Sequence, residues 1–251
     1  SKHRGARLAG GRAMTTPYGT FYPPNITPDR DTGIGAWSDQ AFEQALRQGI
    51  SPTGAPYYPA FPYTAYTHLS DQDVSDLKAY LFAQPPVVQT NRLHELAEPF
   101  AWRSALWLWR WLFFQPGPLA PAPEQSAEWQ RGRYLVLALG HCGECHSPRG
   151  WLGDLDPGRA FAGNAQLPDG DKAPNLTPGP QRGLRAWSDA DLLDLLDSGV
   201  KPDGDVVGGS MAGLNAAYYA AKGGKTVALF DRIQGPGCDV RCAALCRIIT
   251  A

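Results

Sequence analysis

The sequence of 251 residues is short of methionine, of cysteine and of net charge. Its two methionines are Met14 and Met211, and its five cysteines are an odd number that leaves any disulfide framework incomplete. A net charge of −1 gives no indication of a nucleic-acid partner or of attraction to an anionic membrane surface. No run of about 18 apolar residues occurs, so the sequence predicts no membrane-spanning helix. What remains is a chain long enough for one large or two ordinary domains.

The clearest chemical signal is the segment Cys142-Gly-Glu-Cys145-His146. The pattern C-x-x-C-H is typical of covalent c-type haem attachment. The two thiols suit thioether bonds to the porphyrin vinyl groups, and the imidazole of His146 can bind the iron from one side. The abundance of glycine (28) and proline (23) agrees with this prediction, because a haem supplies much of the apolar core of a loop-rich fold.

A redox pair or a zinc site is the alternative interpretation of Cys142 and Cys145. A thioredoxin-like pair belongs beside a βαβ pattern, and none surrounds this segment. Zinc would need two more ligands, which Cys238, Cys242 and Cys246 could supply only through a long return loop. The sequence therefore favours haem.

An internal repeat relates residues 25–61 to residues 175–211 at a constant offset of 150. Twelve of the 37 aligned positions are identical, and no gap is needed. A gapless match of this length predicts two copies of one domain type in the chain.

Each copy should begin with an Asn-x-Thr-Pro loop and continue into a helix with a serine N-cap and a glycine end. The predicted caps are Ser38 and Ser188, and the predicted ends are Gly49 and Gly199. Further helices are expected over residues 74–82, capped from Ser70, and over residues 128–139, which lead into the haem motif.

An electron-transfer haem needs a second axial ligand opposite His146, and methionine there raises the potential. Met211 follows a Gly-Gly-Ser loop and is the predicted distal ligand, the alternative being a core methionine. His141 is the weaker choice because it adjoins the attachment cysteines. Trp187 either packs in the core or donates its indole N–H near a haem propionate. Asn175 either forms a loop turn or supports a propionate or the methionine loop.

The first copy departs from this pattern. The position equivalent to Met211 is Phe61, which cannot bind iron, and the sequence begins without a C-x-x-C-H upstream. The start at Ser1 resembles the stretch that follows His146, so we expect an attachment motif upstream of it. His3 and Met14 are weak candidates for a distal ligand in this copy.

The aromatic segment 100–114 is too short to span a membrane and is interrupted by Arg103 and Arg110. One interpretation is a buried aromatic-rich helix or linker. The other is a docking surface for a partner or a membrane edge, since exposed aromatic patches usually make contacts.

The chain resembles the multihaem cytochrome c subunits of membrane-bound periplasmic alcohol and gluconate dehydrogenases. The stretches that carry the resemblance are 9–13, 22–29, 33–39, 58–66, 128–150 and 175–212. The resemblance implies class I cytochrome c domains that pass electrons from a catalytic dehydrogenase subunit towards quinone or a terminal oxidase. It also matches Cys142, Cys145, His146 and Met211 to the family's haem residues.

The resulting fold prediction is mainly α and loop-rich, with two tandem cytochrome c-like domains and an atypical C-terminal tail. The expected divisions are residues 1–84, a Pro/Trp-rich linker 85–127, a haem-binding domain 128–212 and a tail 213–251. The expected cofactor is one covalent haem c for this sequence, with a second if a further motif precedes Ser1. We expect an electron-transfer subunit, not itself a catalyst, in the periplasm, with peripheral membrane association left open. A thiosulfate-oxidising or free-standing dihaem cytochrome is the alternative within this class.

After Ala212 the chain no longer follows the repeat, and residues 206–231 resemble the opening βαβ unit of a flavin- or nicotinamide-binding protein, closed by Asp231. Both interpretations claim residues 206–212, and the gapless repeat assigns these to the cytochrome. An oxidoreductase fragment of that type is therefore the alternative function. The tail 213–251 is interpreted as a foreign or frame-shifted end, or as the stub of a fused flavoprotein. Its cysteines are an accidental cluster or a metal site.

Overall fold

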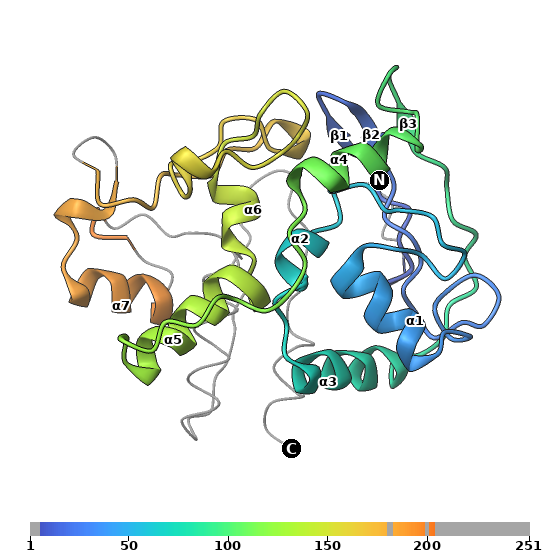
Figure 1. Cartoon of the computed structure of the whole chain (residues 1–251), viewed down its shortest axis with the longest axis horizontal. Coiled ribbons are helices and arrows are strands. Elements are labelled where there is room, and N and C mark those ends of the chain that lie inside the picture. The colour runs from blue at the N-terminus through green and yellow to red at the C-terminus, as the bar shows by residue number, and fades with distance from the viewer. Residues whose placement is uncertain (1–5, 180–182, 199–200, 204–251) are drawn as a thin grey trace. The chain divides into compact units, whose positions relative to one another are not determined.

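The computed structural model describes residues 6–179, 183–198 and 201–203 (Figure 1). Its contacts divide the chain into two compact units, residues 1–176 and residues 177–251. Met211, the cysteines of the tail and the βαβ-like stretch 206–231 lie outside the described residues. The four-part division expected from the sequence stays a prediction.

Helices dominate the first unit. They are α1 (Asp39–Glu43), η1 (Gln44–Gln48), α2 (Tyr63–Tyr66), α3 (Asp71–Phe82), α4 (Ala105–Phe113), α5 (Ala127–Tyr134), η2 (Leu135–Leu139) and α6 (Cys142–His146). The single turns η3 (Pro157–Arg159) and η4 (Pro168–Gly170) follow, and the second unit contributes η5 (Leu184–Ala186) and α7 (Asp189–Ser198). The mainly α prediction is therefore confirmed at the level of class.

A small antiparallel sheet in the order β1-β2-β3 was not predicted from the sequence. Its strands are β1 (Met14–Thr16), β2 (Gly19–Phe21) and β3 (Glu95–Leu96), with Met14 paired to Phe21 and Thr20 to Glu95. Two- and three-residue strands are too short to show an alternating hydrophobic pattern. The hairpin is instead fixed by Thr16, whose hydroxyl donates to the Gly19 carbonyl at 2.8 Å.

The predicted helix ends are confirmed where they are described. The Ser38 hydroxyl accepts from the Ala41 N–H at 3.1 Å, and Ser70 accepts from the Asp73 N–H at 3.1 Å, which satisfies the free donors of α1 and α3. Gly49 ends η1 at a φ of 61°, a left-handed conformation that favours glycine. In the second unit, Ser188 and Asp191 form a reciprocal capping box.

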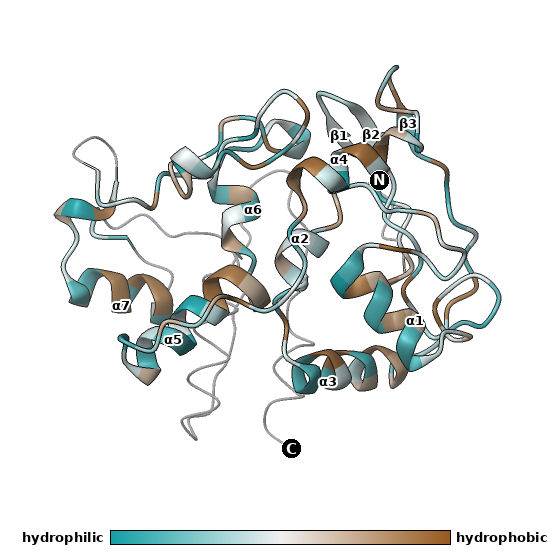
Figure 2. Ribbon diagram, in the orientation of Figure 1, coloured by the Kyte–Doolittle hydropathy of each residue, from teal (hydrophilic) through white to brown (hydrophobic). Residues whose placement is uncertain are grey.

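One hydrophobic cluster joins the first copy of the repeat to the segment before the haem motif. Its buried members are Ile34, Phe42, Leu46, Leu69, Val74, Leu81 and Ala138. Ala138 lies on η2, a hydrophobic stretch that is brown in Figure 2, and it is completely buried. The approach to the attachment motif is thus held by packing against the first copy.

The aromatic segment 100–114 forms α4, and the interpretation that its rings are buried is wrong for most of them. Trp111 is 79% exposed and Trp107 is 52% exposed, whereas Leu106 is buried. The cause is that the arginines face the protein: Arg110 donates to the Gln48 carbonyl and lies over the ring of Phe114. None of the helices in the described part of the chain combines the length and the hydrophobicity of a transmembrane span.

Candidate haem-attachment site

The haem motif forms α6, a short helix entered through His141, whose φ of 39° turns the chain out of η2. Cys142 and Cys145 are three residues apart on this helix, so their thiols lie on one face. Both thiols are free, and burial raises the pKa of each. Reactive redox thiols need the opposite shift, because the thiolate is the nucleophile. The described residues also contain no cluster of three His, Cys, Asp or Glu side chains that could hold zinc.

His146 is oriented by a backbone carbonyl. Its Nδ1 lies 2.9 Å from the carbonyl oxygen of Pro174, which requires that Nδ1 carry the proton and donate. Its Nε2 is then the unprotonated nitrogen and is available to a metal. A second-shell hydrogen bond of this kind is how proteins fix the tautomer and ring orientation of a metal-ligating histidine.

The loop that carries Pro174 is anchored to α6 by a close backbone crossing. Gly163 donates to the His146 carbonyl at 2.7 Å, and Asn164 exchanges two hydrogen bonds with Ala173, at 2.9 and 2.8 Å. Gly163 has a φ of 88°, and a Cβ there would lie 3.0 Å from the Asn175 nitrogen. Only glycine meets both demands.

These residues fit a covalently attached haem. Two thiols on one helix face stand beside an imidazole whose Nε2 is free to coordinate. Asn164 is 7% exposed, and its buried Nδ2 has no hydrogen-bond partner among the described residues. This amide could donate to a polar group on a bound molecule.

The same loop geometry occurs in the first copy. Leu8 and Phe161 have φ of 62° and 60°, and Ile26 and Leu176 donate to their respective carbonyls at 2.9 Å. Gly10 has the conformation of Gly163.

The correspondence extends to the next hydrogen bonds. Gly11 donates to the Pro23 carbonyl as Asn164 does to that of Ala173, which places Pro24 at the position equivalent to Pro174. Further along, Ile34 donates to the Thr27 carbonyl and Leu184 to that of Thr177, both at 2.9 Å. The offset between the copies changes from 153 to 150 residues within the stretch that holds the β1–β2 hairpin in the first copy.

The secondary site residues are partly described. Trp187 is half-buried, and its backbone N–H donates to the Leu184 carbonyl at 3.0 Å. Asn175 is half-buried beside Gly163. The counterpart of Asn175 is Asn25, a loop organiser: its side chain accepts from the Thr27 N–H at 3.0 Å and donates to the Val87 carbonyl at 2.7 Å. A role at a haem propionate stays a prediction for Trp187 and Asn175.

Glu144 is a site residue that sequence reasoning missed. Although it lies between the two cysteines, it is only 8% exposed. Its carboxylate accepts from the Thr64 hydroxyl at 2.6 Å and pairs with Arg149 at 2.6 Å. Thr64 belongs to α2, so one acid inside the motif ties the attachment helix to the first copy. A charged residue in the variable part of the motif was the signal available in the sequence.

His141 lies on the same side of the motif. Its ring makes an edge contact with Tyr66, with centroids 5.3 Å apart. Burial lowers the pKa of His141, so the imidazole is neutral at neutral pH.

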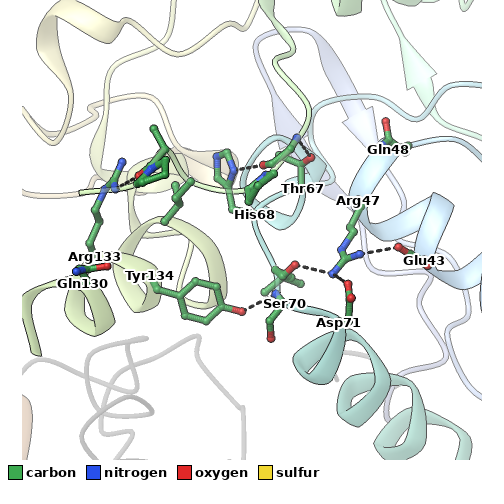
Figure 3. A pocket seen from close by; sticks show the side chains of 16 residues that line it. Glu43, Arg47, Gln48, Thr67, His68, Ser70, Asp71, Gln130, Arg133 and Tyr134 are labelled. Carbon is green, nitrogen blue, oxygen red and sulfur yellow. Dashed lines mark hydrogen bonds and ion pairs between the residues drawn. The ribbon is translucent and has the colours of Figure 1, made fainter. Parts of the chain in front are cut away.

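A cavity of about 680 Å³ lies nearby, between the first copy and the segment 117–121 (Figure 3). Arg47 pairs there with Glu43 and Asp71, each at 2.6 Å, and His68 meets the Gly117 carbonyl at 2.6 Å. The Arg47 ion pairs lie within the first copy, whereas the contacts of Gly117 with His68 and Thr67 hold the connecting segment against it.

The arrangement around α6 is typical of a c-type cytochrome. A dihaem cytochrome c-type protein of Cereibacter sphaeroides is 46% identical over 210 residues, which cover 82% of this chain and 68% of that protein. A nicotinate dehydrogenase subunit from Pseudomonas putida is 43% identical over 207 residues, 82% of this chain and 17% of its own length. The fructose dehydrogenase cytochrome subunit of Gluconobacter japonicus is 42% identical over 198 residues, 78% of this chain and 40% of its own length.

The chain belongs to the dihaem cytochrome c family. Covalently bound haem c and electron transfer through that haem follow from this membership. The chain spans about two thirds of the first relative and less than half of the two dehydrogenase subunits. A family model described as an NAD(P)-binding Rossmann-like domain matches residues 206–245, which agrees with the βαβ resemblance of the tail.

Proposed function

We propose that the chain is the dihaem electron-transfer subunit of a dehydrogenase, built from two tandem cytochrome c-like domains. The hydrogen bond from His146 Nδ1 to Pro174 carries this proposal, because it orients the imidazole for iron. The equivalent loop around Gly10 and Pro24 supports a second haem.

Each residue of the second site has a distinct role. Cys142 and Cys145 would hold a haem through thioether bonds, and His146 and Met211 would bind its iron. Trp187 and Asn175 would support the pocket around its propionates. The haem, when bound, supplies iron that cycles between two oxidation states. The protein orients the imidazole of His146 through the carbonyl of Pro174.

The partner is a dehydrogenase catalytic subunit, and the electrons pass on to quinone or a terminal oxidase. The names of the relatives support this, since they include subunits of nicotinate, fructose, gluconate and alcohol dehydrogenases. Because covalent haem attachment normally takes place outside the cytoplasm, the periplasm is the proposed location. Peripheral membrane association agrees with the exposed aromatic rings of α4.

A second candidate is supported by the family match at residues 206–245: a fused or fragmentary nicotinamide- or flavin-binding segment. It overlaps the electron-transfer proposal only at residues 206–211, which include Met211, and leaves the haem-attachment residues 142–146 unaffected.

A haem count and a potential test the function. The protein, expressed from its own gene with the maturation machinery, should give two haems per chain in a pyridine haemochrome assay. Met211→Ala should lower the midpoint potential of one haem, because thioether ligation raises it, while Met14→Ala should leave both potentials unchanged. Absence of covalent haem together with bound flavin would favour the second candidate, and an unchanged potential in Met211→Ala would exclude Met211 as ligand.

A further inference from the structure

An ion pair is built into the haem-attachment motif. Glu144 lies between the two attachment cysteines and is only 8% exposed, and its carboxylate pairs with the guanidinium of Arg149 at 2.6 Å. Because Glu144 adjoins Cys145 in the chain, a haem held by Cys142 and Cys145 would have both charges close to it. Any effect on that haem rests on the proposed function, since it requires the haem of the second copy to exchange electrons.

Arg149 is held beside the carboxylate by hydrogen bonds to groups that cannot move away from it. Besides the carboxylate, its guanidinium donates to the backbone carbonyl of Glu144 at 3.1 Å and to that of Gly153 at 2.7 Å. The side chain is 26% exposed, so solvent screens its charge only in part. The positive and the negative charge therefore keep a fixed arrangement on the attachment helix α6.

The first copy holds the other oxygen of the same carboxylate. The hydroxyl of Thr64, on α2, donates to Oε1 of Glu144 at 2.6 Å, while Arg149 donates to Oε2. A hydrogen bond to a carboxylate stabilises its charged form and fixes its direction. Thr64 is thus a positioning residue, which acts on the second site through Glu144.

We propose that the Glu144–Arg149 ion pair sets the reduction potential of the haem in the second copy, and that Thr64 couples this potential to the first copy. Oxidation adds one positive charge to a haem, so a nearby anion lowers the potential and a nearby cation raises it. With both side chains in place, the two effects oppose each other. Contact between the copies thereby becomes part of the electron-transfer site.

Potentiometric titration of the full-length, haem-loaded protein tests this inference, after the haem content of each variant is fixed by pyridine haemochrome. Glu144→Gln keeps an acceptor for the Thr64 hydroxyl and removes the negative charge, so a midpoint potential should rise. Arg149→Met removes the cation and leaves the carboxylate, so the same potential should fall. The double variant should lie closer to the parent protein than either single variant, because the charges are then removed as a pair.

Two further variants separate the buried pair from ordinary surface charge. Thr64→Val should lower the potential by less than Arg149→Met does, and it should have little effect once Glu144 is glutamine. Arg159→Met is the matched control, since Arg159 pairs with Asp156 in the following loop but is 64% exposed, and should leave the potentials unchanged. The shifts in the Glu144 and Arg149 variants should persist at high salt, because buried charges are little screened.

A purely structural role of the pair predicts a different pattern. A loosened pocket admits water, which favours the more highly charged oxidised haem and lowers the potential in every variant. A fall in both Glu144→Gln and Arg149→Met would therefore overturn the inference, and so would potentials equal to the parent protein's in both. If Arg149→Met does not fold, Glu144→Gln decides alone, since only the electrostatic role predicts a rise.

The haem count distinguishes this inference from the proposed function. Covalent haem with unshifted potentials would overturn the role of the ion pair and leave the electron-transfer proposal standing. Absence of covalent haem from the parent protein would overturn both.

Discussion

Replacement of Glu144 by alanine should destabilise the protein by about 3 kcal/mol. Removal of one partner of a buried ion pair costs about 3–5 kcal/mol when the other charge stays buried. Arg149 is 26% exposed and still donates to the Gly153 carbonyl at 2.7 Å. The loss of the ion pair should therefore cost less than that range, about 2 kcal/mol. The Thr64 hydroxyl loses its acceptor, which adds about 1 kcal/mol.

The assay is thermal unfolding followed by far-ultraviolet circular dichroism at fixed haem content. For a chain of this size about 1 kcal/mol shifts the midpoint by roughly 2–4 °C, so Glu144→Ala should melt about 6–12 °C lower. Glu124→Ala is the matched control, since Glu124 is exposed and should shift the midpoint little. Thr64→Val should cost about 1 kcal/mol and should add almost nothing once Glu144 is already alanine. Equal midpoints for Glu144→Ala and Glu124→Ala would refute the reasoning.

Three further predictions concern other parts of the first unit. Gly163→Ala should lower haem incorporation and stability more than Gly170→Ala. Both glycines have positive φ, but only at Gly163 does backbone lie within 3.2 Å of the added Cβ. Equal haem contents and equal melting temperatures for the two variants would contradict this. Leu106→Ala should lower the free energy of unfolding by about 2–4 kcal/mol and Trp111→Ala by under about 0.5 kcal/mol, since only Leu106 is buried. Urea unfolding measures both, and a large loss of stability in Trp111→Ala would support the interpretation that the rings of α4 are buried. Burial, and then the charge of Arg103, lowers the pKa of His94 from 6.5. The unfolded chain therefore binds more protons below about pH 6.5, and the free energy of unfolding should fall as the pH drops through that window. His94→Gln should flatten this part of the curve of stability against pH, and an unchanged slope would argue against the prediction.

Local signals in the sequence predicted the helices and their ends well. Ser38, Ser70 and Ser188 each precede helix-forming residues, and each hydroxyl accepts from a backbone N–H that the first helical turn leaves free. Each cap can therefore be found without tertiary information. Gly49 is equally local. The motif at residues 142–146 and the family were predicted for the same reason, since a contiguous pattern carries them.

Contacts between distant segments escaped prediction. The pairing of Glu95 with Thr20 brings a residue from the middle of the chain to the hairpin, and no short-range pattern encodes that. The sequence left the exposure of α4 open because hydrophobicity alone does not show whether its arginines face the protein or the solvent. The carbonyl of Pro174 as acceptor for His146 depends on loop closure across 28 residues, which spacing cannot show.

The position of Glu144 limits how freely this cytochrome could be recombined. The two residues between the cysteines are the part of the motif that haem chemistry leaves unconstrained, and here one of them makes a contact with α2. If the second copy were moved into another protein, Thr64 in the first copy would lose the carboxylate that accepts its hydroxyl. In the new protein Glu144 would lose the hydroxyl that donates to it. The two copies of the repeat are therefore less independent than the duplicated sequence implies. We expect exchange of a single copy between relatives to succeed only when the residues at positions 64, 144 and 149 are exchanged together.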